Sequence, residues 1–120
     1  METVAHPPRT IMEVYEMLPQ GTLAELINEQ IYMSPAPSFD HHRITKFITK
    51  QLDKIIEDTG RGLVIFAPFD VKLDDRNSVQ PDIFIILKAN RNQIVKGRFS
   101  GVPDLIIEIL SIGNKSHDLL

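Results

Sequence analysis

An acidic residue inside a strongly apolar segment constrains this chain more than any other feature. Glu108 lies in the run from Asp104 to Leu110, in which every residue other than the two acids is leucine or isoleucine. Such a run is typical of a buried β-strand. An ionised carboxylate in a buried strand is unfavourable unless a cation, a hydrogen-bond donor or a proton compensates it. The sequence therefore predicts that Glu108 has a specific partner.

A second acidic residue lies in the preceding strand-like segment. Asp82 follows Pro81 in a segment that we expect to form a strand from Ser78 to Leu87. Side chains alternate between the two faces of a strand, so Asp82 and Glu108 can converge if their faces lie on the same side of one sheet. Magnesium prefers oxygen ligands, commonly one or two carboxylates together with waters and phosphate oxygens. The pair is therefore a candidate magnesium site.

Both carboxylates also have a purely structural interpretation. Asp82 could be a strand-edge or turn carboxylate after a proline, because structural ion pairs also involve buried acids. Glu108 could form a salt bridge with Lys72 or Arg61. The residues alone leave these alternatives open.

The size and composition of the chain indicate one small domain. With 120 residues, the chain is long enough for one core and too short for two ordinary domains. His6, Pro7 and Pro8 mark residues 1–10 as a flexible arm, and we expect residues 11–120 to form the domain. The fractions of hydrophobic residues, 42%, and of charged residues, 24%, are ordinary for a globular protein.

Composition also excludes several classes of function. No apolar stretch approaches the roughly 18 residues of a membrane span, and the N-terminus lacks a secretory signal pattern, so we expect a cytoplasmic protein that does not enter a membrane. Because the chain has no cysteine, disulfides, thiol nucleophiles and cysteine zinc sites are excluded. A net charge of -3 argues against coating nucleic acid through bulk positive charge, but local patches can still contact phosphates.

Hydrophobic periodicity and turn residues predict a mixed order of helices and strands. The most secure element is a helix over residues 39–59, capped by Ser38, whose apolar residues recur at spacings of three and four. Its predicted buried residues are Ile44, Phe47, Ile48, Leu52, Ile55 and Ile56. The other expected elements are a helix over 11–18, two antiparallel strands within 23–33, strands over 63–66, 69–73, 78–87 and 104–110, and a short helical turn in the polar connection between the last two. This order predicts an α+β or mixed α/β core.

The polar face of the long helix carries a basic stripe. Arg43, Lys46, Lys50 and Lys54 recur at helical spacing and could lie along a phosphate backbone, or could simply form a solvated face. No aromatic series interleaves with them, so stacking on single strands is not predicted.

Three further polar residues have weaker signals. His41 and His42 stand at the start of the long helix, where acid–base work or metal ligation is conceivable, but we interpret them as helix-start contacts. Asp70 could support the metal shell or fix the bend of its strand, and we favour the structural role.

Several motifs occur together in a fixed order from about Val14 to Leu120. They are Glu25-Leu26-Ile27, Met33-Ser34-Pro35, His41, Ala67-Pro68-Phe69-Asp70-Val71, Val79-Gln80-Pro81-Asp82, Gly101-Val102-Pro103-Asp104-Leu105 and Ile107-Glu108-Ile109-Leu110-Ser111. In this combination the chain resembles the Uma-type family of putative restriction endonucleases, within the PD-(D/E)XK nuclease superfamily. The resemblance implies a restriction endonuclease-like core, with a central mixed sheet flanked by helices.

The resemblance also implies a site and a reaction. Asp82 and Glu108 would be the catalytic residues and would bind magnesium, or another divalent cation such as manganese, together with the backbone carbonyl of Ile109. Glu25 would either be a further metal ligand or make a contact with one of the other ligands. The implied activity is endonuclease hydrolysis of DNA phosphodiester bonds, with DNA contacts from Arg43, Lys46 and Lys50 and a homodimer as the expected assembly.

One position departs from the superfamily pattern. Leu110 stands two residues after Glu108, where the superfamily has a lysine that orients water and stabilises phosphate. The Uma-type family carries its lysine on a following helix, so we expect a domain that is incomplete at its C-terminal end, with Lys115 as the nearest substitute. The alternative to an endonuclease is therefore a non-catalytic remnant or a nucleic-acid-binding domain without the catalytic lysine.

Overall fold

The computed structural model describes residues 7–110. The predicted features of residues 1–6, the expected C-terminal incompleteness and Lys115 lie outside the described residues. The elements are α1 (Ile11–Glu16), β1 (Ala24–Ile27), β2 (Gln30–Met33), α2 (Phe39–Ile55), β3 (Gly62–Phe66), β4 (Val71–Asp74), β5 (Asn77–Val79), β6 (Ile83–Leu87), the 3-10 helix η1 (Lys88–Gln93), β7 (Ile94–Val95), β8 (Arg98–Ser100) and β9 (Leu105–Ile107). None of the helices within residues 7–110 is long and apolar enough to cross a membrane.

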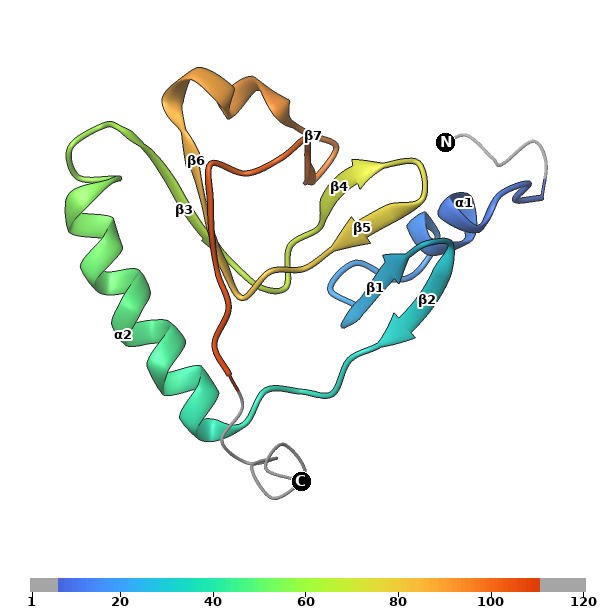
Figure 1. Cartoon of the computed structure of the whole chain (residues 1–120), viewed down its shortest axis with the longest axis horizontal. Helices are drawn as coiled ribbons and strands as arrows, with labels where there is room; N and C mark the ends of the chain where they lie inside the picture. Colours follow the sequence, from blue (N-terminus) through green and yellow to red (C-terminus); the bar gives the residue numbers. More distant parts are fainter. Residues whose placement is uncertain (1–6, 111–120) are drawn as a thin grey trace.

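The strands form two sheets. One sheet has six strands in the order β2-β1-β5-β4-β8-β7, in which only the β4–β8 pairing is parallel, and the other has three antiparallel strands in the order β3-β6-β9. Figure 1 shows α2 along one side of the molecule and the β1–β2 hairpin with α1 on the other side, joined along the bottom by residues 34–38. The α+β fold with a mixed sheet and helices is as predicted.

A bent two-stranded ribbon connects the two sheets. The ribbon runs from the β3–β6 pair in the smaller sheet to the β4–β5 pair in the larger one. Both of its strands are interrupted at a proline, Pro68 on one side and Pro81 on the other, and proline has no backbone N–H to contribute to a ladder. The Ala67 N–H still donates to the Asp82 carbonyl at 3.0 Å, which holds the two interruptions side by side. Each strand therefore changes sheets at the same level.

The prediction of one continuous strand over 78–87 is wrong. The segment is divided into β5 and β6 by residues 80–82. Pro81 cannot donate a ladder hydrogen bond, and the Gln80 N–H donates to the Glu25 carboxylate instead of a neighbouring strand. Asp82 consequently lies at the break, directly before β6.

The prediction that Glu108 lies inside a buried strand is also wrong. β9 covers only Leu105–Ile107, at the edge of the smaller sheet, and the side chains of Leu105 and Ile106 are 49% and 42% exposed. The strand ends because the Ile109 N–H donates to the carboxylate of Asp82 rather than to backbone. Glu108 is therefore an exposed residue just beyond the strand end.

The core lies on both faces of β6. Phe84 and Ile86 are fully buried against Val71 and Phe99 of the larger sheet, and the Phe84 ring packs against Phe99 with centroids 6.4 Å apart. On the other face, Ile83 and Ile85 pack with Val64 against α2. Such alternation places β6 in the middle layer, between α2 and the larger sheet.

Helix α2 buries a narrower face than its sequence predicts. Ser38 accepts a hydrogen bond from the His41 N–H at 3.1 Å, which confirms the predicted cap. The residues that pack on the smaller sheet are Ile48, Leu52 and Ile56. Phe47 and Ile55, predicted to be buried, are 65% and 53% exposed. One residue step turns a helix by about 100°, so Phe47 points away from the face that Ile48 buries.

Two short strands were not expected in the polar connection after β6. After η1, the strands β7 and β8 form a hairpin whose turn is Lys96-Gly97, both with positive φ, 52° and 77°. β8 then pairs in parallel with β4 and buries Phe99 completely. A lysine at the first turn position is an unusual hairpin signal, because a positive φ favours Asn, Asp or Gly there.

The first hairpin agrees with its prediction. The turn between β1 and β2 is formed by Asn28 and Glu29, both with positive φ, 49° and 67°. The Asn28 N–H donates to the side chain of Asn77 at 2.9 Å, and the Glu29 N–H to the carbonyl of Arg76 at 3.1 Å. These bonds fix the hairpin to the β4–β5 turn and so orient β1 toward the break in the ribbon.

We expect Phe84→Ala to lower the free energy of unfolding by about 3–5 kcal/mol, because it opens a cavity between the two sheets. Urea denaturation measures the change. Phe66→Ala, at a side chain that is 56% exposed, is the matched control and should cost less than about 1 kcal/mol. Equal effects of the two substitutions would contradict the assignment of the core.

Candidate functional site

A pocket of about 960 Å³ opens beside the break in the ribbon. One wall is the N-terminal half of α2, a second is the segment from Ser34 to Ser38, and the third is formed by the interruptions at residues 66–68 and 80–82. Glu25, Asp82, Glu108 and Ile109 all line this pocket. The four metal-site residues predicted from the sequence therefore share one pocket.

Asp82 is fixed by two contacts from different elements. Its Oδ2 accepts a hydrogen bond from the Ile109 N–H at 2.7 Å, and its Oδ1 lies 3.2 Å from Nε2 of His41 on α2. The side chains of Asp82 and His41 are each 19% exposed, so this pair is largely withdrawn from water. A carboxylate held at both oxygens has a defined orientation toward the pocket.

Glu108 lies next to Asp82. Ile83 pairs with Ile107 across the β6–β9 ladder, and extending that antiparallel register by one residue puts Asp82 opposite Glu108. The pKa of Glu108 is raised to about 7, first by desolvation, then by the charge of Asp82 and a hydrogen bond with it, and then by the charge of Glu25. Three acidic groups therefore repel one another in the pocket. Lys72, one proposed partner of Glu108, pairs with Glu16 instead.

Glu25 is held by a hydrogen-bond network behind the pocket. Its Oε2 accepts the Gln80 N–H at 2.6 Å. The Gln80 side-chain amide donates to the Thr22 carbonyl and to Oδ1 of Asp70, both at 3.0 Å. The same Asp70 oxygen accepts the Tyr15 hydroxyl at 2.8 Å. Burial, followed by the hydrogen bond to Asp70, raises the pKa of Tyr15, so its hydroxyl stays a donor.

The donor set suits a hard cation but does not enclose one. Asp82, Glu108 and Glu25 offer carboxylate oxygens, and a divalent cation would relieve the repulsion that adds to desolvation in raising the pKa of Glu108. Within residues 7–110, however, no group of three or more His, Asp or Glu side chains is arranged to hold an ion by itself. Magnesium commonly uses one or two carboxylates and fills its remaining positions with water and phosphate oxygens. The residues therefore fit an open site of that kind.

The predicted DNA-contact residues lie along α2. Arg43, Lys46 and Lys50 are all exposed, and Lys46 also lines the pocket. Leu110, at the position of the superfamily lysine, is 85% exposed. Lys46 is thus the only lysine or arginine among the described residues that line the pocket.

Sequence reasoning missed the roles of two residues. His41 was interpreted as a helix-start contact, but its ring reaches Asp82 as well. Gln80 was expected inside a strand, whereas it joins Glu25 to Asp70 at the break. The Gln-Pro-Asp order was the available signal, because a proline that interrupts pairing leaves its neighbours free for side-chain partners.

We expect Asp82→Asn to lower the pKa of Glu108 from about 7 toward its ordinary value of 4.5, because the substitution removes the nearest negative charge. A carboxyl-carbon NMR titration in EDTA measures this. Asp104→Asn, a control at an acid bonded to Leu87 and Asn90, should leave the pKa of Glu108 unchanged. An unchanged pKa in Asp82→Asn would refute the pairing.

The raised pKa of Glu108 also has a thermodynamic consequence. An acid that binds its proton more tightly when folded stabilises the fold fully below its unfolded pKa, near 4.5, and this contribution is lost as the pH rises through about 7. Glu108→Gln should therefore flatten the pH dependence of stability in that interval. Because the carboxyl is largely in contact with solvent, we expect a small effect.

Comparisons with known proteins agree with the resemblance read from the motifs. A crystal structure described as a putative nuclease belonging to DUF820 from Anabaena variabilis matches with a TM-score of 0.71 and 20% sequence identity. The match covers 93% of this chain and 64% of that chain, so this chain spans about two thirds of its relative. This structural match confirms the predicted restriction endonuclease-like fold. No curated protein matches significantly. The family model Uma2, putative restriction endonuclease, matches residues 12–120, and the chain therefore belongs to that family.

Proposed function

We propose that the protein is a magnesium-dependent endonuclease that hydrolyses DNA phosphodiester bonds. The observation that supports this most is the pairing of Asp82 with Glu108 in a pocket of about 960 Å³, where desolvation first and the charge of Asp82 second raise the pKa of Glu108. Two carboxylates that repel each other at an open pocket are better suited to bind a cation than to form a structural ion pair. Membership of a family described as putative restriction endonucleases supports the reaction class.

Each residue of the pair has a distinct part in the proposal. Asp82 is held in place by His41 and by the Ile109 N–H, so it supplies a fixed oxygen ligand. Glu108 lies on the exposed side and completes the pair once it is deprotonated. The carbonyl of Ile109 and the carboxylate of Glu25 are the proposed additional ligands, with Glu25 oriented by Gln80.

The chemistry that a bound divalent ion supplies is polarisation of the phosphodiester and activation of an attacking water. The protein residues position the ion and the substrate. Lys46, which lines the pocket and is exposed on α2, is the proposed contact to a phosphate beside the scissile bond, and Arg43 and Lys50 continue this contact along the helix. A homodimer is the proposed assembly.

A second candidate function is nucleic-acid binding without cleavage. The superfamily lysine is replaced by Leu110, whose side chain is 85% exposed and carries no charge. A site without that cation could bind magnesium and DNA and still fail to activate water. Turnover therefore separates the two functions.

We expect Asp82→Asn and Glu108→Gln each to weaken magnesium binding by at least about tenfold, because each removes one charged ligand. Isothermal titration calorimetry measures the affinity, and cleavage of supercoiled plasmid in magnesium measures the activity. Both substitutions should abolish cleavage. Glu29→Gln, in the exposed hairpin turn, is the control and should change neither measurement.

Three results distinguish the interpretations. Retained magnesium affinity and cleavage in Glu108→Gln would refute the proposed site. Magnesium binding by the wild-type chain without cleavage of any DNA would favour the second candidate. No heat of magnesium binding in the wild-type chain would leave the carboxylate pair with a structural role.

A further inference from the structure

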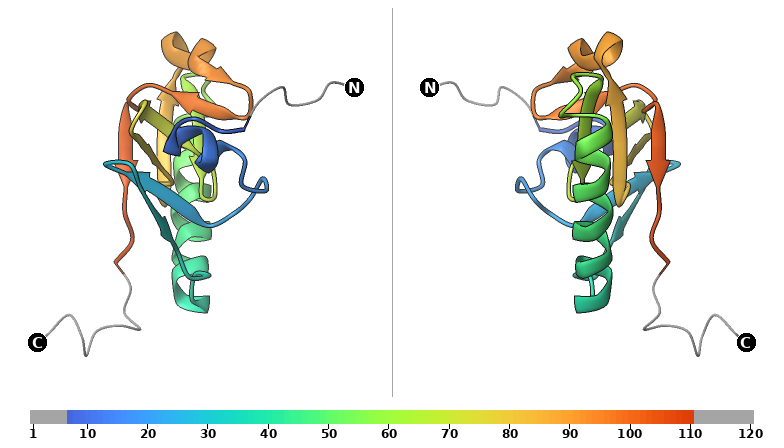
Figure 2. Two further views of the ribbon diagram at one scale, coloured as in Figure 1. Left: turned by 90° about the vertical axis from the view of Figure 1, so that its right-hand side faces the viewer. Right: turned by 90° about the vertical axis from the view of Figure 1, so that its left-hand side faces the viewer.

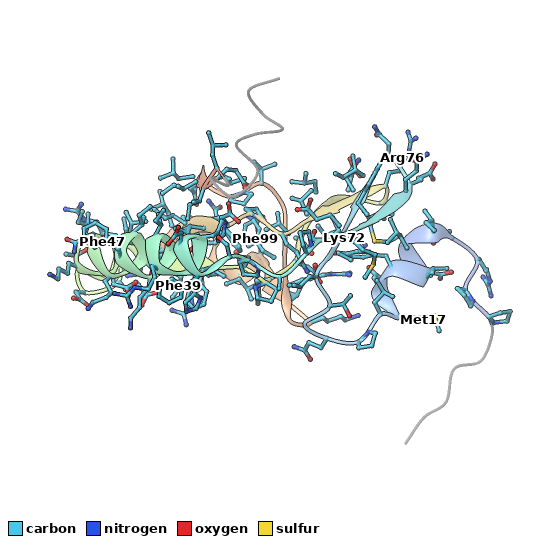
Figure 3. The ribbon with its side chains drawn as sticks, turned by 90° about the horizontal axis from the view of Figure 1, so that it is seen from below. Met17, Phe39, Phe47, Lys72, Arg76 and Phe99 are labelled. Atoms are coloured by element: carbon cyan, nitrogen blue, oxygen red, sulfur yellow. The ribbon has the colours of Figure 1, made fainter. Side chains whose placement is uncertain are left out.

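The outward face of α2 combines exposed aromatic rings with basic side chains. Phe39 and Phe47 are 76% and 65% exposed, and both lie on α2 (Figure 3). Phe39 lies four positions before Arg43 and Phe47 four positions after it. The three side chains therefore follow one ridge of the helix. Two exposed rings on either side of a cation suit a ligand that offers both flat aromatic faces and negative charge.

A parallel ridge carries the remaining cations. Lys46, Lys50 and Lys54 also follow one another at steps of four residues and are exposed. None of the four basic side chains on α2 forms a salt bridge within residues 7–110. The cations of this face are therefore available to a negatively charged partner.

The charges along α2 are unequally distributed. Asp40 is the only acid over the first three turns of α2, whereas Asp53, Glu57 and Asp58 gather at and beyond its end. Positive charge thus predominates from Arg43 to Lys50. The right-hand view of Figure 2 shows α2 in front of the sheet, and none of residues 7–110 crosses its outer side.

We propose that this face of α2 binds single-stranded nucleic acid, with Phe39 and Phe47 stacking on unpaired bases and Arg43, Lys46 and Lys50 contacting phosphates. The inference rests on the proposed nuclease function and specifies its substrate. In a duplex the bases already stack on one another, so exposed rings gain a partner only from unpaired bases. Cations between the rings interrupt any continuous apolar stripe, which disfavours a partner helix.

The position of Lys46 connects this face with the candidate site. Lys46 belongs to the basic ridge and also lines the pocket that contains Asp82 and Glu108. His42, one turn before it, lines the same pocket. A strand that follows the ridge toward the N-terminus of α2 is thereby led to the carboxylate pair.

The test measures binding in EDTA, so that cleavage does not contribute. Fluorescence anisotropy compares a labelled single-stranded 20-mer with the duplex of the same length. We expect the single strand to bind at least about tenfold more tightly. Phe47→Leu should weaken that binding about fivefold or more, because leucine is apolar but cannot stack, whereas Phe47→Trp should retain it. Lys50→Ala should reduce the salt slope of the logarithm of affinity by about 0.7.

Tyr32→Ala is the matched control, because Tyr32 is an aromatic residue 49% exposed on β2, away from α2, and it should bind like the wild type. Equal affinity for duplex and single strand, or an unchanged affinity in Phe47→Leu, would overturn the inference. So would binding of anionic vesicles in place of DNA, or a dimer on size exclusion that Phe47→Leu dissociates. If single-strand binding is observed but cleavage is not, only the proposed catalysis is refuted. If cleavage is observed but the preference for single strands is not, only this inference is refuted.

Discussion

The interruption of one β-ribbon at Pro68 and Pro81 is the constraint on which the rest of this structure depends. A proline contributes no N–H to a ladder, so both strands lose their pairing at one level and pass from the smaller sheet to the larger one. The backbone and side-chain groups freed at this level find partners elsewhere. The Gln80 N–H is taken by Glu25 of β1, and the Asp82 carboxylate takes the N–H of Ile109. The same interruption therefore bends the fold and gathers residues of β1, α2 and the segments beside β6 and β9 around one pocket.

The electrostatics of the pocket follow from that gathering. A single buried acid would be stabilised by one base, as expected for an ordinary structural carboxylate. Here the nearest charges to Glu108 are the acids Asp82 and Glu25, so desolvation and repulsion act in the same direction and raise its pKa to about 7. The protein holds Asp82 through its contact with His41 and the hydrogen bond from the Ile109 N–H, and leaves the repulsion between acids in place. Such an arrangement keeps affinity for a cation, because binding one removes an unfavourable interaction that already exists.

Much of this could be predicted from local patterns, and the failures have physical causes. The cap at Ser38, the Asn28-Glu29 turn and the convergence of Asp82 with Glu108 follow from rules that involve near neighbours or strand alternation. The exposure of Glu108 could not be predicted, because a run of leucine and isoleucine does not reveal whether its strand lies in the centre or at the edge of a sheet. The contact of His41 with Asp82 depends on how α2 packs across the break, which no local spacing encodes.

The exposure of Phe47 shows how an error about packing alters an inference about function. Six apolar positions of the α2 region suggest a wide buried face, but the helix packs on a sheet of three short strands, which has room for only one line of side chains, Ile48, Leu52 and Ile56. The Phe47 ring, predicted to lie in the core, therefore emerges among the cations of the opposite face, where the sequence alone predicts charge without aromatic residues. A narrow sheet thus determines both what α2 buries and what it presents to a ligand. The chemistry of the exposed face is a consequence of the size of the sheet beneath it.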